Sequence, residues 1–237
     1  TIAQRVKESA PTLNRDPDRE HIELRKAFST YLERESGVKL SVDQLWGANG
    51  SNEIMLQLFQ AFGGPGRIAL GCDPTYSMYP EYARDTFTTR KLAHRNADFT
   101  LDVDATIRAI EDVKPAMIVL TSPNNPTGTD EQENSLAAVC RAVGDKPIFI
   151  LCDDVYRGLC MRPCPDPATL PGRRERLLIA QSFSKPWAMT GWRIGYLMGS
   201  APVIRKLTAL HGHILTCAPS MLQAACETAL ETDTAPM

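Results

Sequence analysis

The sequence predicts an α/β fold of three layers, with helices on both faces of a mostly parallel, mixed sheet. Amphipathic helical patterns alternate along the chain with short apolar stretches, as they do in layered α/β proteins. The stretch 148–152 is continuously apolar instead of alternating, which is typical of a central parallel strand covered on both faces. A chain of 237 residues is also long enough to bury a sizeable core.

The elements follow in a regular order. We expect strands over residues 44–48, 67–71, 87–92, 117–121, 148–152, 177–181 and 193–198. We expect helices over residues 18–35, 54–62, 79–84, 104–113, 131–143, 202–215 and 219–230. Residues 1–215 are expected to form one large cofactor-binding domain, and residues 216–237 to begin a helix leading toward a second, small domain. Because the chain starts and stops within or just after helical patterns, we expect a fragment or shortened relative of a longer enzyme.

Composition excludes several classes of protein. The 26 basic and 28 acidic residues nearly balance, so no basic stripe indicates a nucleic-acid partner. No apolar run is long enough to cross a membrane.

Seven cysteines are an odd number in a long chain, which argues against a disulfide framework and favours a reducing cytoplasm. Cys152, Cys160 and Cys164 lack the C-x-x-C spacing of zinc sites and are expected to be buried or loop thiols.

The segment Ser182-Phe183-Ser184-Lys185 is the most informative motif. It follows the apolar residues 177–180, and Arg193 lies eight positions beyond the lysine. A lysine at the mouth of a sheet can form a Schiff base with an aldehyde, while Ser182, Ser184 and Arg193 can hold a phosphate. An aldehyde together with a phosphate indicates pyridoxal 5'-phosphate. The alternative is an ordinary surface lysine near a serine.

Two loops after predicted strands carry further candidates. Gly50-Ser51-Asn52 lies at a strand-to-helix turn, where free backbone N–H groups and the helix dipole favour an anion. An ordinary helix cap explains the same residues. Asn125 lies in Ser122-Pro123-Asn124-Asn125-Pro126-Thr127-Gly128 and can donate its amide to a phenolate oxygen, although a proline-fixed turn accounts for the segment as well.

A third loop begins with Asp153, directly after the apolar strand 148–152. A carboxylate there is costly to bury unless it is paired. Opposite a pyridine nitrogen, Asp153 would raise the pKa of that nitrogen and keep it protonated, which improves the ring as an electron sink. Tyr156 lies three residues on and can hydrogen-bond a phenolic ring oxygen. Taken alone, Asp153 reads better as a helix N-cap.

These four segments, in this order, resemble the large domain of fold-type I, class I/II aminotransferases, and the resemblance covers nearly the whole chain. It implies a three-layer α/β/α fold and a pyridoxal-phosphate cofactor bound to Lys185. It also implies that Tyr76, in Pro74-Thr75-Tyr76, stacks on the pyridine ring. By the same resemblance the cofactor phosphate is held by Ser51, Asn52, Ser182, Ser184 and Arg193. The ring oxygen is contacted by Asn125 and Tyr156, and the ring nitrogen by Asp153.

The two halves of the chain resemble different branches of this family. Residues 46–53 and 62–66 are similar to histidinol-phosphate aminotransferases, especially those of actinobacteria, whereas residues 182–199 are more similar to aspartate and aromatic aminotransferases. Thr190-Gly191-Trp192-Arg193 stands where histidinol-phosphate enzymes usually have Ala-Gly-Leu-Arg. Asp16 stands where they usually have a tyrosine that reaches the cofactor phosphate across the dimer interface, and a carboxylate there repels a phosphate.

The resemblance implies transfer of an amino group from histidinol phosphate or an aromatic amino acid to 2-oxoglutarate, with Lys185 as general base and acid, in a cytoplasmic homodimer. An aspartate-type aminotransferase, a β-lyase or a decarboxylase would share most of this cofactor shell. A non-catalytic aminotransferase-like domain, such as the cofactor-sensing part of a transcriptional regulator, is a rival of another class. A third rival is a chain that binds pyridoxal phosphate without turnover, because the family's substrate-carboxylate arginine lies beyond residue 237.

Overall fold

The computed structural model describes residues 1–13, 19–160, 164–171 and 174–232. The chain divides into two compact units. Thr1–Ile54 and Gln181–Met237 form one unit, and Met55–Ala180 form the other. The helix α3 (Ser51–Phe62) and the strand β6 (Leu177–Ser182) each contribute residues to both units.

The unit of Met55–Ala180 is built on parallel strands. Its strands are β2 (Ile68–Asp73), β3 (Thr89–His94), β4 (Met117–Thr121), β5 (Phe149–Asp153) and the first four residues of β6. Pairing is parallel throughout, in the order β3-β2-β4-β5-β6. Thr121, the last residue of β4, pairs with Asp153, the last residue of β5, so these two strands end level with one another. The loops that follow β4 and β5 are therefore neighbours.

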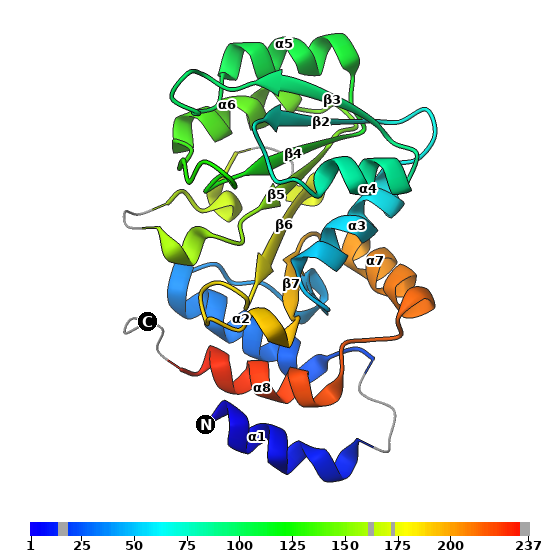
Figure 1. Ribbon diagram of the computed structural model, residues 1–237, viewed down its shortest axis with the longest axis vertical. Coiled ribbons are helices and arrows are strands. Elements are labelled where there is room, and N and C mark those ends of the chain that lie inside the picture. The colour runs from blue at the N-terminus through cyan, green and yellow to red at the C-terminus, as the bar shows by residue number, and fades with distance from the viewer. Residues whose placement is uncertain (14–18, 161–163, 172–173, 233–237) are drawn as a thin grey trace. The chain divides into compact units, whose positions relative to one another are not determined.

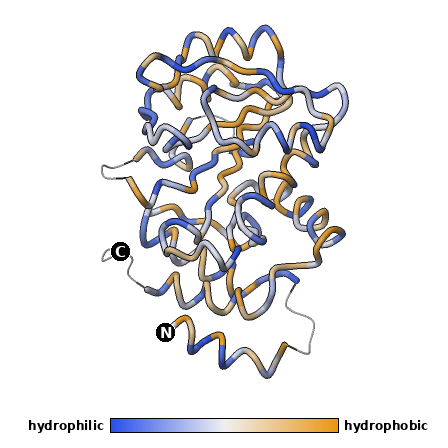
Figure 2. Tube along the Cα trace, viewed as in Figure 1, coloured by the Kyte–Doolittle hydropathy of each residue, from blue (hydrophilic) through white to orange (hydrophobic). Residues whose placement is uncertain are grey.

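Helices cover the parallel strands of this unit. They are α4 (Tyr79–Asp85), α5 (Val103–Val113), α6 (Glu133–Val143) and most of α3. Helix α5 packs beside α6 and along β2 and β3 (Figure 1). Every residue of β4 is buried, as expected for a strand covered on both faces. Figure 2 shows the hydrophobic residues concentrated along these inner strands.

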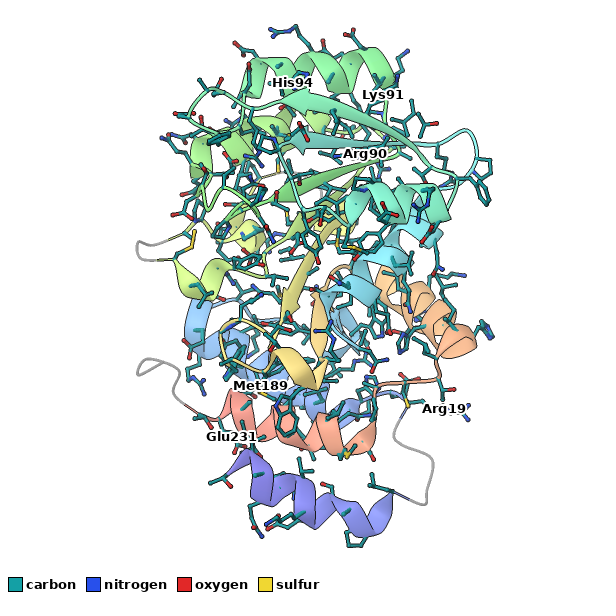
Figure 3. All side chains as sticks on the ribbon, in the orientation of Figure 1. Arg19, Arg90, Lys91, His94, Met189 and Glu231 are labelled. Atoms are coloured by element: carbon teal, nitrogen blue, oxygen red, sulfur yellow. A yellow bond between two sulfur atoms is a disulfide. The ribbon has the colours of Figure 1, made fainter. Side chains whose placement is uncertain are left out.

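Strand β3 forms the edge of this parallel sheet and carries polar residues along most of its length. Arg90, Lys91 and His94 lie on it (Figure 3). Most of its residues are exposed or partly exposed, in contrast to the wholly buried β4. Charged side chains on an edge strand discourage pairing with another chain.

The other unit combines a pair of antiparallel strands with helices. β1 (Leu45–Ala48) pairs with β7 (Gly195–Met198), with Ala48 opposite Gly195. The helices are α1 (Ile2–Ser9), α2 (Ile22–Ser36), α7 (Ala201–Ile214) and α8 (Ser220–Leu230). Both α2 and α7 pack against β1, and α8 packs against α1 and α2 (Figure 1). An aromatic core holds this unit, in which Phe28 stacks on Tyr196 at 4.4 Å between ring centroids.

Short 3-10 turns connect these elements. They span Ala10–Thr12, Val42–Gln44, Arg157–Leu159, Pro167–Thr169, Arg174–Arg176 and Thr190–Trp192. Within the part of the chain that the structure describes, no helix is long and apolar enough to cross a membrane.

The predicted α/β class is confirmed, and the predicted strands and helices form within a few residues of the expected positions. Two strands begin two residues later than predicted. The backbone of Phe87 has φ 55° and that of Arg193 has φ 55°, a left-handed conformation that no strand contains, so β3 starts at Thr89 and β7 at Gly195. The predicted domain boundary after residue 215 stays a prediction.

Candidate functional site

The predicted site residues fall into two groups, one in each unit. We call Ser51, Asn52, Ser182, Ser184, Lys185 and Arg193 the lysine group, and Tyr76, Asn125, Asp153 and Tyr156 the ring group. Asp16 lies outside the described residues. The geometry of each group is given by itself.

The turn at the start of α3 forms the first part of the lysine group. Gly50 has φ 90°, and α3 begins at Ser51. A Cβ placed on Gly50 would lie 2.6 Å from Nη2 of Arg193, so the guanidinium lies directly against this turn. Backbone N–H groups at a helix N-terminus and a guanidinium both bind phosphate. The donor set therefore fits a phosphate group.

The left-handed turn at Arg193 is what directs that side chain. Arg193 follows the 3-10 turn Thr190–Trp192, and its Nη1 donates to the carbonyl of Thr190 at 3.0 Å. The guanidinium thus contacts both the Thr190 carbonyl and the turn at Gly50.

Ser182 and Ser184 lie just before Lys185 in the sequence and are linked by a hydrogen bond. The Ser184 N–H donates to Ser182 Oγ at 3.1 Å, and Ser182 Oγ donates to the carbonyl of Ile194 at 3.4 Å. Both serines are buried, and Lys185 is partly buried. The carbonyl of Lys185 accepts from the Ala188 N–H at 3.2 Å, which closes a turn directly after β6. The lysine is thus anchored through its backbone at the end of a strand.

Glu53 stabilises the same turn, a role that no sequence pattern indicates. Its carboxylate accepts from the Asn49 N–H at 3.2 Å and lies 3.2 Å from Nδ1 of the buried His211 on α7. Burial raises the pKa of Glu53, but the hydrogen bonds from His211 and Asn49 outweigh burial and leave the pKa below its usual value. An ionised Glu53 therefore fixes the residues just before Ser51.

Gly195 permits the close packing of the lysine group, because it lies against backbone on three sides. A Cβ at Gly195 would lie 2.7 Å from the Gln181 carbonyl oxygen, 2.8 Å from the Ser51 nitrogen and 3.0 Å from the Gly50 carbonyl carbon. Backbone atoms cannot rotate away as a side chain can, so any side chain here must separate β7 from the turn at Ser51.

We therefore expect Gly195→Ala to destabilise the fold by about 1–3 kcal/mol and to weaken phosphate binding, since overpacking costs energy of this order. Gly191→Ala is the matched control, because a Cβ at Gly191 meets no atom within 4 Å. Urea unfolding and a titration with pyridoxal phosphate measure the two effects. Equal behaviour of the two variants would contradict this account of the turn.

Asn125 and Tyr156 come together in the ring group. Asn125 Nδ2 donates to the Tyr156 hydroxyl at 3.0 Å, joining the loop after β4 to the loop after β5. Both residues line a cavity of about 370 Å³, together with Pro123, Gly128 and Leu159 among others. The side chains of Asn125 and Tyr156 thus meet at the wall of this cavity, which lies at the carboxyl ends of parallel strands. Folds of this kind bind ligands at those ends.

Asp153 ends β5, and its partner is Tyr79. The Tyr79 hydroxyl donates to Asp153 Oδ2 at 2.6 Å. Burial raises the pKa of Asp153, while the hydrogen bonds from Tyr79 and from the Val155 N–H oppose that rise without cancelling it. Burial and the nearby carboxylate raise the pKa of Tyr79 well above its usual value, so Tyr79 stays protonated and remains a donor.

The environment of Asp153 fits a protonated ring nitrogen. Neutral donors alone leave the pKa of this carboxyl raised, so its charge is incompletely stabilised. A pyridinium N–H would add the opposite charge that the carboxylate lacks. The partly buried Tyr76 lies near Tyr79, their ring centroids 5.6 Å apart in an edge-on arrangement, so Tyr79 contacts both Tyr76 and Asp153.

A buried ion pair positions the loops of the ring group. Arg95 pairs with Glu131, and both side chains are 2% exposed. Arg95 Nε donates to the carbonyl of Pro74, two residues before Tyr76, at 3.2 Å. Asn124, next to Asn125, donates to the same carbonyl at 3.3 Å. One buried network therefore ties the Tyr76 loop to the Asn125 loop.

Sequence reasoning missed Tyr79, Glu53 and Arg95. A signal for Tyr79 did exist, because a tyrosine in the first turn of a predicted helix follows Tyr76 by three residues. Its contact with Asp153, however, joins positions 74 residues apart. Nothing in the pattern of charges relates Arg95 to Glu131 or Glu53 to His211.

The chain matches a known protein family over nearly its whole length. A family model described as aminotransferase class I and II matches residues 1–235. Proteins named histidinol-phosphate aminotransferase are 68% identical over 214 residues in Bifidobacterium adolescentis and 39% identical over 234 residues in Rhodococcus opacus. The matches cover 86% and 98% of this chain but 54% and 60% of the relatives. The chain thus spans little more than half the length of these relatives.

Solved structures agree on the fold. An aspartate aminotransferase from Thermus thermophilus superposes with a TM-score of 0.89 at 25% identity, covering 97% of this chain and 64% of that one. An aspartate aminotransferase from Thermotoga maritima gives a TM-score of 0.91 at 22% identity, covering 100% of this chain and 64% of that one. The second likeness shows the fold alone.

Proposed function

This chain belongs to the class I and II aminotransferases, and we propose that it forms most of the cofactor-binding part of an enzyme that transfers the amino group of histidinol phosphate to 2-oxoglutarate. The cofactor is pyridoxal 5'-phosphate. When bound, it supplies an aldehyde that reacts with amines and a ring that accepts electrons. The donor is proposed from the relatives that carry histidinol phosphate in their names. An aromatic amino acid is the second candidate, from the resemblance of residues 182–199.

Each residue has a proposed task. Lys185 holds the cofactor and then, as a free amine, takes the proton from the substrate Cα and returns it, as general base and acid. The backbone N–H groups of Ser51 and Asn52 hold the phosphate with Ser182, Ser184 and Arg193. Asn125 and Tyr156 bind the ring oxygen, and Tyr76 stacks on the ring.

The observation that carries this proposal is the hydrogen bond from Tyr79 to Asp153 at 2.6 Å. It orients a carboxylate whose pKa is raised by burial, and this carboxylate gains most from a cationic partner such as a protonated pyridine nitrogen. Keeping that nitrogen protonated is the electronic requirement of transamination. We also propose, from the family alone, a cytoplasmic homodimer.

A comparison of amino donors tests the reaction. The protein is loaded with pyridoxal phosphate and mixed with histidinol phosphate, phenylalanine, tyrosine or aspartate, with 2-oxoglutarate as acceptor. The proposal expects glutamate to form fastest with histidinol phosphate, together with the corresponding oxo product. Pyruvate with ammonia would instead identify a β-lyase, and preference for aspartate would contradict the proposed donor.

A further inference from the structure

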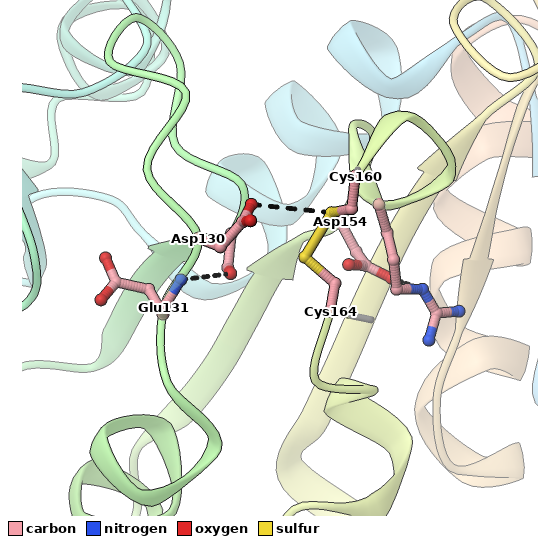
Figure 4. The surroundings of a disulfide bond; sticks show 7 residues. Asp130, Glu131, Asp154, Cys160 and Cys164 are labelled. Atoms are coloured by element: carbon pink, nitrogen blue, oxygen red, sulfur yellow. Dashed lines mark hydrogen bonds and ion pairs between the residues drawn. A yellow bond between two sulfur atoms is a disulfide. The ribbon is translucent and has the colours of Figure 1, made fainter. Parts of the chain in front are cut away.

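Cys160 and Cys164 form a disulfide in a loop after β5 (Figure 4). Cys160 directly follows the 3-10 turn Arg157–Leu159, which itself follows Tyr156 of the ring group. The Leu159 N–H donates to the Tyr156 carbonyl at 2.9 Å, and the Cys160 N–H donates to the Arg157 carbonyl at 3.1 Å. The bonded cysteine is therefore connected to Tyr156 through one continuous hydrogen-bonded turn.

These two cysteines are the accessible ones among the seven. Both are partly exposed, whereas the other five are buried (Cys72, Cys140, Cys152, Cys217 and Cys226). Burial raises the pKa of Cys140 to about 11 and also raises that of Cys72, Cys152 and Cys226. The thiolate is the reactive form of cysteine, so burial disfavours thiol chemistry at those positions.

The disulfide also faces the loop that carries Asn125. Asp130, at the end of that loop, has its Oδ1 3.6 Å from Cys160 Sγ (Figure 4). Cys160 lines the same cavity as Asn125 and Tyr156. A disulfide sulfur has no proton, so this contact becomes a hydrogen bond only when Cys160 is a thiol. The redox state thus changes the interaction between the two loops that the Asn125–Tyr156 hydrogen bond joins.

We propose that Cys160 and Cys164 are a redox-active pair that reacts with low-molecular-weight thiols and disulfides and tunes cofactor binding by the ring group. On oxidation, one Cys thiolate attacks a disulfide RSSR and releases one thiolate RS⁻, leaving a mixed disulfide. The second Cys thiolate attacks the protein sulfur of that mixed disulfide and releases the second RS⁻. Two protons and two electrons leave the pair, and RSSR becomes two RSH.

The disulfide form is the one that binds the cofactor more tightly. It ties Cys160, which directly follows the turn after Tyr156, to Cys164 in the structure in which Asn125 donates to Tyr156 at 3.0 Å. Reduction breaks the bond to Cys164 and lets the Cys160 thiol donate to Asp130, so cofactor binding must then displace Cys160 from this second arrangement. We expect affinity for pyridoxal phosphate to fall about fivefold on reduction, a modest reorganisation cost. This second part rests on the proposed function, whereas the redox reaction does not.

The first experiment measures the redox reaction without any cofactor. The native chain is equilibrated in glutathione buffers of graded ratio with EDTA, thiols are trapped with N-ethylmaleimide, and labels are located by mass spectrometry. We expect one two-electron transition in which Cys160 and Cys164 gain labels together. A pair that stays fully reduced in oxidised glutathione, or that keeps one glutathione on a single cysteine, would overturn the proposal.

The second experiment compares the affinity for pyridoxal phosphate of oxidised and reduced chain, with the Cys160→Ser/Cys164→Ser double variant as control. The wild-type chain should show the difference and the double variant should not. Equal affinity in both states of the wild type would overturn the coupling. Failure of both states to bind would contradict the proposed function instead, and the redox transition measured without cofactor would stand unaffected.

Discussion

Replacing Lys185 with alanine is expected to abolish covalent capture of pyridoxal phosphate and to lower transamination by at least about 10²- to 10⁴-fold, the range for loss of a positioned acid–base group. The backbone of Lys185 is anchored at the end of β6, next to the Ser182–Ser184 hydrogen bond of 3.1 Å. No neighbouring residue of that turn can supply an amine. The absorption band of lysine-bound pyridoxal phosphate, and the mass of the chain after removal of free cofactor, measure the loss.

Lys206→Ala is the matched control, because Lys206 is an exposed lysine on α7 in the same unit. It should keep the full absorption band and the full added mass. A Lys185→Ala chain that still captured one equivalent of cofactor would contradict the assignment of this lysine.

Replacing Asp153 with asparagine is expected to have opposite effects on stability and on chemistry. Burial raises the pKa of Asp153, so the folded chain binds this proton more tightly than the unfolded chain does. Stability from this group is therefore present at low pH and is lost as pH rises from about 3.9, the usual value for Asp, through the raised pKa. Without cofactor, the variant should be at least as stable as the wild type at pH 7, with a smaller pH dependence.

With cofactor, the same variant should lose about 10²- to 10³-fold in transamination, the scale of removing one electrostatic contact. It should also gain less stability from pyridoxal phosphate than the wild type does. Thermal unfolding between pH 4 and pH 8, with and without cofactor, separates the two effects.

The neighbouring Asp154→Asn variant controls for a merely structural role. Asp154 is 1% exposed and pairs with Arg157 at 3.0 Å, so its loss should destabilise the chain with and without cofactor alike. An Asp153→Asn chain that was destabilised in the same way would show that Asp153 serves the fold and not the ring nitrogen.

Much of the fold could be predicted because its signals are local. The strand Met117–Thr121 lies where the continuous apolar run predicts it, and Gly37 ends α2 with φ 68°, as a glycine C-cap does. The candidate site residues follow from the same logic. Once the strands are placed, Asn125 and Asp153 lie at the carboxyl ends of β4 and β5, and Thr121 pairs with Asp153 in register.

The features that could not be predicted depend on tertiary contacts or on backbone turns. Tyr79 reads as an ordinary residue of a helical first turn until the fold brings it to Asp153. The left-handed turn at Arg193 interrupts a segment whose apolar pattern favours a strand from that point. The expectation that Cys160 and Cys164 are thiols is wrong, because the two form a disulfide. Their spacing gave no indication of it, since it matches no C-x-x-C redox or metal motif.

Borohydride reduction of the native chain with pyridoxal phosphate, followed by peptide mapping, tests the central claim most directly. Reduction fixes the cofactor to whichever amine holds it. We predict one stable adduct per chain, located on Lys185 in the peptide that contains Ser182-Phe183-Ser184-Lys185. Label spread over exposed lysines such as Lys206, with none concentrated on Lys185, would contradict it.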